Sequence, residues 1–271
     1  MKLEWIRKGV HLLALSAGLG MAASAPGEDS AASREIAKYR DMLKDGNPAE
    51  LLEMQGETLW KKPRGAKNAT LERCDLGLGA GVVEGAYAQL PRYFADTGKV
   101  QDVESRLVTC MQTLQGLSLE QATHGWYKPG SDMEALVTFV ATQSHGASID
   151  VPARHASEAA MYAIGEGLFQ RRSGPLDFAC ATCHSQEAKR IRLQELPNLM
   201  TTEGARQSMA EWPAYRVSQG AVWGMERRLI DCLRQMRLPD ADFTSEAIIA
   251  LQVYLQKNAS GAKLNAPGIK R

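Results

Sequence analysis

The stretch Cys180-Ala181-Thr182-Cys183-His184 decides the fold class of this chain of 271 residues. Two thiols three residues apart can form thioether bonds with the two vinyl groups of a haem, and the next histidine then lies under the iron. This is the attachment signature of c-type haem, with His184 as the proximal ligand. A thioredoxin-like pair would need a βαβ setting, and a zinc site would need a second ligand pair at comparable spacing. Neither is visible, so one haem bound covalently to Cys180 and Cys183 is predicted.

Residues 1–25 have the pattern of a secretory signal peptide. Lys2, Arg7 and Lys8 precede an apolar stretch, and small residues follow it. The apolar stretch is too short and too rich in glycine and alanine for a good membrane span, and no later stretch is long enough. We therefore expect an exported, soluble protein without a membrane span, located in the periplasm, where disulfides persist.

The remaining sequence contains an internal repeat. Residues 56–60 resemble residues 165–169 at an offset of 109, and the same offset aligns Cys74 with Cys183. Residues 103–110 resemble residues 225–232 at an offset of 122, with an arginine and a cysteine identical in both segments. We interpret these matches as two tandem domains, residues 26–150 and 151–271, that meet near residues 145–152.

The first copy lacks the residues that hold a haem. Leu71 and Asp75 stand where the second copy has Cys180 and His184. The fold class predicted is therefore all-α, with two tandem cytochrome c-like domains, the first without haem and the second binding one c-type haem.

Apolar residues at helical spacing support this class. Met161, Ile164 and Leu168 predict a helix before the haem motif, with Ser157 as its N-cap. Further helices are predicted at residues 34–44, 225–236 and 245–256, and a helix is predicted to open at Asn47-Pro48. Strand-like alternation is scarce.

Three cysteines remain besides the haem pair, and an exported protein with three is expected to form one disulfide. Cys74 and Cys110 lie in the same haem-less copy, at positions that would flank an iron, so the repeat pairs them. Cys232 is left over. Its neighbours Arg227, Arg228 and Arg234 would favour the thiolate, which is a good axial iron ligand.

Two alternatives for the distal side of the haem stay open at this point. Cys232 can be an inert buried thiol. The distal ligand is then a methionine, as in ordinary cytochromes c, and the candidates are Met200, Met209, Met225 and Met236.

The charge is unevenly distributed between the two halves. Residues 26–151 have 13 Lys/Arg against 18 Asp/Glu, and residues 152–271 have 16 against 12. A basic haem half suits an anionic substrate or an acidic partner. Nothing resembles a basic arm that binds nucleic acid, so no nucleic-acid partner is expected.

Together these features resemble the SoxA family, cytochrome subunits of the periplasmic thiosulfate-oxidising system. The resemblance rests on the tandem arrangement and on residues 179–186, 212–215 and 226–232. It is to the single-haem branch, whose first domain has a disulfide in place of its haem. It implies an L-cysteine S-thiosulfotransferase that works in a heterodimer with a SoxX-like small c-type cytochrome and joins thiosulfate to a cysteine of a SoxYZ-like sulfur carrier.

The resemblance also implies roles for particular residues. His184 and Cys232 would be the axial ligands, and Cys232 would be the catalytic residue, bearing an extra sulfur as a persulfide. Arg228 would bind the anionic substrate, with Lys257 as a second basic residue.

Three competing functions are considered. A plain electron-transfer cytochrome c predicts a methionine ligand and an inert Cys232. A thiosulfate dehydrogenase that forms tetrathionate usually has two haem motifs on one chain. A docking subunit would use the acidic first domain as its contact surface.

Overall fold

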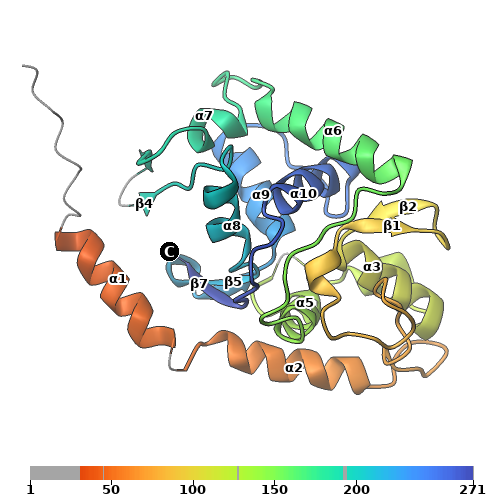
Figure 1. The fold of residues 1–271 in the computed structure, drawn as a ribbon. Coiled ribbons are helices and arrows are strands. Elements are labelled where there is room, and N and C mark those ends of the chain that lie inside the picture. The colour runs from red at the N-terminus through yellow and green to blue at the C-terminus, as the bar shows by residue number, and fades with distance from the viewer. Residues whose placement is uncertain (1–30, 45, 127, 192–193, 271) are drawn as a thin grey trace, which may run out of the picture.

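The computed structural model describes residues 31–44, 46–126, 128–191 and 194–270 (Figure 1). The predicted signal peptide, residues 1–25, lies outside the described residues. Within the described ranges helices dominate and every strand has two or three residues. None of the helices in these ranges is long and apolar enough to cross a lipid bilayer.

The α-helices are α1 Ala31–Lys44, α2 Ala49–Lys61, α3 Val103–Cys110, α4 Leu119–Ala122, α5 Asp132–Thr142, α6 Ala156–Gln170, α7 Cys180–His184, α8 Thr202–Met209, α9 Met225–Gln235 and α10 Glu246–Asn258. A π-helical turn, Met111–Gln115, extends α3, and two 3₁₀ turns lie at Tyr87–Gln89 and Val217–Gln219. The strands are β1 Arg92–Phe94, β2 Lys99–Gln101, β3 Arg190–Ile191, β4 Gln194–Glu195, β5 Ala214–Arg216, β6 Ala221–Trp223 and β7 Gly268–Lys270.

The predicted helices are present, but the start predicted for α6 is wrong. The N-cap is His155, whose ring Nδ1 accepts the Ser157 N–H at 3.2 Å. The Glu158 carboxylate accepts the His155 N–H at 3.0 Å and completes the capping box. Ser157 lies inside the helix because an imidazole nitrogen replaces the hydroxyl acceptor that the prediction assumed.

The same helix crossing occurs once in each half of the molecule. α2 packs on α5, and α6 packs on α10 (Figure 1). At each crossing a glycine lets the two backbones approach closely. A Cβ on Gly56 would lie 2.1 Å from the Ala135 carbonyl oxygen, and a Cβ on Gly165 would lie 2.0 Å from that of Ala250.

Each half also contains a short antiparallel hairpin that leads into a helix. β1 and β2 precede α3, and β5 and β6 precede α9, at the offset of 122 residues seen in the sequence. β7 adds a parallel strand to β5 and ties the C-terminal segment to this hairpin. These strands were not predicted, because three residues are too few for a period of two to appear in the sequence.

One hydrophobic core runs through both halves. Its fully buried members include Leu71, Leu107 and Leu136 from the first half, with Phe169 and Ile248 from the second. Polar contacts join the halves as well. The Tyr93 N–H donates to Glu158 at 2.8 Å, and the Gln252 amide donates to Asp102.

Candidate functional site

The attachment motif forms the short helix α7. At its start, the Ala179 N–H donates to the Thr182 hydroxyl at 2.9 Å. Because Cys180 and Cys183 are three residues apart in a helix, they lie on the same side of it. Burial, with smaller contributions from the Cys232 and Cys183 thiols, raises the pKa of Cys180 to about 12. The free thiol is therefore protonated at neutral pH.

His184 is oriented by a backbone carbonyl. Its ring Nδ1 lies 2.9 Å from the Pro197 oxygen, so Nδ1 carries the proton and donates. Burial, and then the charge of Arg228, lower the pKa of His184, while the bond to Pro197 opposes them. The neutral imidazole that results keeps a lone pair on Nε2, which is the form that ligates metals.

Cys232 on helix α9 lies close enough to the attachment motif for its thiol to affect the pKa of Cys180, although about 50 residues separate them in the sequence. The thiols of Cys232, Cys180 and Cys183 interact electrostatically with one another. Burial raises the pKa of Cys232, while Arg228 and Arg216 oppose this effect. Arg228 thus favours the thiolate, as expected from the sequence, but desolvation of the thiol is the larger effect.

Of the three arginines predicted to lower the pKa of Cys232, only Arg228 has a prominent effect on it. Arg227 forms an ion pair with Glu134 on α5, and Arg234 pairs with Asp240 at 2.7 Å. Neighbouring residues of a helix point about 100° apart, so Arg227 and Arg228 face different parts of the molecule. Arg228 donates to Asp231 at 2.8 Å within α9.

The second cation at Cys232 is Arg216, which the sequence analysis missed. It lies at the end of β5, and its charge interacts with Arg228, Asp231 and the Cys232 thiol. Burial, followed by the repulsion from Arg228, lowers the pKa of Arg216 to about 10, so it stays protonated at neutral pH. A signal existed in the repeat, because the position equivalent to Arg216 in the first copy is Phe94.

Lys257 lies in the last turn of α10, where its ammonium group donates to the Val151 carbonyl oxygen at 2.9 Å. The charged residues with the largest effect on the Cys232 thiol are Arg228, Asp231 and Arg216. The described contacts therefore place Lys257 against the segment that links the two halves.

In the first half, Cys74 and Cys110 form a buried disulfide with a Cα–Cα distance of 5.6 Å. This is the pairing that the repeat indicates. Arg106, the counterpart of Arg228, is buried above the Phe94 ring and donates to Asp96 and to the Asp75 carbonyl oxygen. The arginine of the first copy thus has a structural role.

The methionines considered as distal ligands have other surroundings. Met209, Met225 and Met236 are buried core residues. Met200 is half-exposed, and its sulfur accepts the Gln170 amide at 3.2 Å. The thiol of Cys232, by contrast, interacts electrostatically with the Cys180 thiol of the attachment motif.

These donors fit a c-type haem. Two thiols on one side of a helix can form the thioethers, and the imidazole of His184 has its second nitrogen held by a carbonyl. The thiol of Cys232 comes from a different helix and interacts with both attachment cysteines. Soft thiolates and imidazoles are established axial ligands of haem iron.

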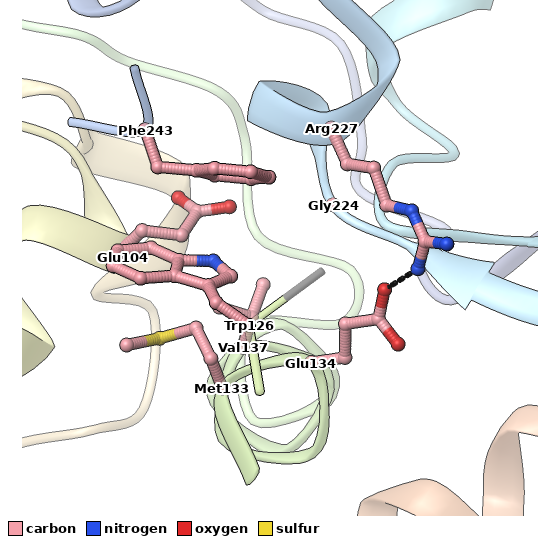
Figure 2. Close-up of a pocket in the computed structure, with 8 residues that line it drawn as sticks. All are labelled: Glu104, Trp126, Met133, Glu134, Val137, Gly224, Arg227 and Phe243. Atoms are coloured by element: carbon pink, nitrogen blue, oxygen red, sulfur yellow. Dashed lines mark hydrogen bonds and ion pairs between the residues drawn. The ribbon is translucent and has the colours of Figure 1, made fainter. Parts of the chain in front are cut away.

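A separate pocket lies where the two halves meet (Figure 2). Figure 2 shows Glu104, Trp126 and Phe243 on one side and the Arg227–Glu134 ion pair on the other. None of the cysteines lines this pocket, and neither does His184. It is therefore a different place from the haem site.

The fold and the site define a class of protein, a c-type cytochrome in which a cysteine of helix α9 lies near the attachment motif. The chain belongs to the SoxA/TsdA cytochrome c domain family, which matches residues 55–149 and 164–264.

Individual relatives agree with this assignment. The chain is 47% identical over 273 residues to the L-cysteine S-thiosulfotransferase subunit SoxA of Hydrogenophilus thermoluteolus, covering 98% of this chain and 100% of that protein. It is 33% identical over 240 residues to an L-cysteine S-thiosulfotransferase subunit SoxA of Hydrogenobacter thermophilus, covering 87% and 90%. Among solved structures, SoxXA from P. pantotrophus has a TM-score of 0.72 at 20% identity, covering 86% of this chain and 84% of that one, which shows a common fold.

Proposed function

We propose that this chain is the catalytic cytochrome subunit of a periplasmic thiosulfate-oxidising complex, an L-cysteine S-thiosulfotransferase. The observation that carries the proposal is the meeting of Cys232 with the attachment motif, with Arg228 acting on both the Cys232 thiol and the His184 imidazole. Relatives named for this activity span the chain almost end to end.

Residues 151–271 form the haem domain in this proposal. Cys180 and Cys183 would attach one c-type haem, and His184 Nε2 and Cys232 Sγ would ligate its iron. When bound, the haem supplies one-electron redox chemistry. Residues 26–150 form a haem-less cytochrome c-like domain, in which the Cys74–Cys110 disulfide supplies order that a haem would otherwise give.

The overall reaction joins the sulfane sulfur of thiosulfate to the sulfur of a carrier cysteine. A new S–S bond forms and the S–H bond of the carrier breaks, which releases one proton. Thiosulfate and the thiol together lose two electrons, and a SoxX-like partner cytochrome accepts them one at a time. The product is a carrier cysteine S-thiosulfonate.

The residues of the site have distinct roles in this reaction. Arg228 binds the sulfonate oxygens of thiosulfate, since a guanidinium matches the spacing of such oxygens. Cys232 bears an extra sulfur as a persulfide, whose outer sulfur forms an S–S bond with the sulfane sulfur of thiosulfate as two electrons pass to the partner cytochrome. The carrier thiolate then attacks the sulfane sulfur, breaks that S–S bond and takes the thiosulfonate group, which restores the persulfide on Cys232. Lys257 is a second proposed basic residue, and its substitution tests whether it reaches the substrate.

The partners and location follow from the same proposal. A SoxX-like cytochrome forms the heterodimer, and a SoxYZ-like carrier presents the cysteine. Residues 1–25 direct export to the periplasm and are removed. The acidic first domain contributes an interface for the smaller cytochrome.

The electron-carrier alternative has less support. It requires a methionine ligand and an inert Cys232, whereas Cys232 interacts with both attachment cysteines and three of the four candidate methionines are core residues. A tetrathionate-forming dehydrogenase would use thiosulfate as both reactants, and a carrier protein would not be modified.

The intact mass of the exported protein tests the proposal. One haem and about 32 Da of extra sulfur on the Cys232 peptide are expected. Cys232→Ser should keep the covalent haem and abolish thiosulfate transfer to the carrier. An unmodified Cys232 that alkylates freely in the native holoprotein, or full activity of Cys232→Ser, would exclude the assignment.

A further inference from the structure

We propose that Arg216 is a substrate-binding residue for thiosulfate and that Trp223 is the residue that positions it. This inference rests on the proposed function and assigns a part of the site that the sequence analysis did not find. The observations that carry it are the Arg216 guanidinium over the Trp223 ring, its buried Nε without an acceptor among the described residues, and the effect of its charge on the Cys232 thiol.

The first reason is a donor of Arg216 that has no acceptor. Its Nε is buried and has no hydrogen-bond partner among the described residues. Buried donors normally have acceptors, and a missing one costs free energy. A sulfonate oxygen bound next to Cys232 would supply that acceptor and would remain close to the reacting sulfur.

The second reason is that Arg228, the other cation near Cys232, is already paired with a carboxylate. Arg228 donates to Asp231 at 2.8 Å, so part of its charge is already compensated. Thiosulfate carries two negative charges, and two cations at Cys232 match that charge. Because Arg216 and Arg228 repel each other, a dianion between them relieves the repulsion.

The third reason is the difference between the two copies. Arg228 has a counterpart in Arg106, which pairs with Asp96 in the haem-less half. Arg216 has Phe94 at its equivalent position, and Trp223 has Gln101. The arginine and the tryptophan are therefore specific to the half that carries the attachment motif.

Trp223 connects Arg216 with the first half of the molecule. The Arg216 guanidinium carbon lies over the buried Trp223 ring at 5.5 Å from its centroid, and that of Arg227 lies over it at 4.6 Å. Arg227 in turn pairs with Glu134 on α5 (Figure 2). Since a guanidinium over an indole face is attracted to it, the ring restricts where Arg216 can point.

The experiment compares four charge-removing variants, together with Arg216→Lys, Trp223→Leu and Trp223→Phe, of the holoprotein in complex with its partner cytochrome, with thiosulfate as the probe. Arg216→Gln, Arg228→Gln and Lys257→Gln each remove one cation of the proposed or candidate site. Arg206→Gln is the matched control, because Arg206 lies on α8 with an exposed side chain that donates to the Ser260 carbonyl oxygen. The KM for thiosulfate and kcat are measured for each, and the haem absorption spectrum reports whether the ligands are intact.

Arg216→Gln should raise the KM for thiosulfate by roughly tenfold to a hundredfold, as expected for the loss of a charged hydrogen bond. Arg216→Lys should recover part of this loss, because it restores the charge without the forked geometry. Trp223→Leu should raise KM by about threefold to tenfold with little change in kcat, and Trp223→Phe should recover most of it, because a phenyl ring keeps an aromatic face. Arg206→Gln should be unchanged.

A KM for Arg216→Gln equal to that of the wild type would overturn the inference while leaving the proposed function intact. The same holds if Lys257→Gln raises KM and Arg216→Gln does not. Full transfer activity of Cys232→Ser would instead refute the proposed function, so the two failures are distinguishable.

Discussion

Gly165 on α6 faces the backbone of Ala250 on α10 so closely that a Cβ on the glycine would lie 2.0 Å from the Ala250 carbonyl oxygen. Real Cβ atoms do not approach a backbone oxygen this closely, so the contact sets how near the two helices can come. Gly56 and Ala135 form the same contact between α2 and α5, at 2.1 Å. Both halves are thus built on one type of helix crossing.

Gly165→Ala is expected to lower the free energy of unfolding by about 1–3 kcal/mol or more, because a methyl group there forces the helices apart. Gly167→Ala is the matched control in the same helix, since nothing lies within 4 Å of its added Cβ. The control should be neutral or stabilise by up to about 1 kcal/mol through helix propensity. Urea unfolding of both holoproteins measures the difference, and equal stabilities would contradict the crossing described above.

Removal of the Cys74–Cys110 disulfide should destabilise the first half. The bond closes a loop with a sequence separation of 36 residues, and its loss should cost about 3–4 kcal/mol through the added freedom of the unfolded chain. Cys74→Ser/Cys110→Ser is the variant, and chemical unfolding is the measurement. The haem spectrum should stay unchanged, because both cysteines lie in the half without the attachment motif. An altered haem spectrum in the variant would show that the two halves fold as one unit.

The stability of the protein should fall as the pH rises because of Glu104. Its side chain is buried near Asp102 and Glu226, with carboxylate oxygens of the three within 4.8 Å of one another. Burial, and then the charge of Asp102, raise the pKa of Glu104 well above its ordinary value. The folded protein therefore keeps a proton that the unfolded chain releases above a pH of about 4.3.

The direction of the pH dependence of stability follows from this difference in protonation between the folded and unfolded chains. The contribution of Glu104 is fully present below the pKa of the unfolded chain and is lost as the pH rises toward the folded pKa. Glu104→Gln mimics the protonated group at every pH, so its stability relative to the wild type should grow with pH, by up to about 1.4 kcal/mol per unit. The free energy of unfolding of both proteins, measured from pH 4 upward, gives this difference in stability. The free energy of unfolding of Glu203→Gln, on the surface of α8, should depend on pH as that of the wild type does. The prediction would be contradicted if the free energy of unfolding of Glu104→Gln also had the same pH dependence as the wild type.

The ion pair between Arg227 and Glu134 should behave as a buried pair. Glu134 is 5% exposed and Arg227 is 19% exposed in their side chains. Glu134→Gln leaves the Arg227 charge without its partner, and the expected cost is about 3 kcal/mol. Glu134→Gln/Arg227→Met removes both charges and should recover a large part of that loss. Unfolding of the single and double variants gives the interaction energy, and additive losses would show that the pair contributes nothing.

The sequence alone determined those features whose physical cause is local. The attachment motif needs two thiols and an imidazole within five residues of one helix, so spacing was enough to find it. Helices α6, α9 and α10 follow from apolar residues at a period of 3.6, and the pairing of Cys74 with Cys110 follows from the repeat. The family resemblance rests on the same local patterns, and it agrees with the family found by comparison.

Tertiary structure alone decided which side chains meet. Arg227 and Arg228 are adjacent in the sequence, yet a step of about 100° around the helix sends one to Glu134 and the other to Cys232. Arg216 reaches Cys232 from a hairpin of three-residue strands that no sequence pattern indicated. Burial also raises the pKa of the Cys232 thiol, although the charges of both arginines lower it. Burial depends on how the whole chain packs and is not fixed by any one segment.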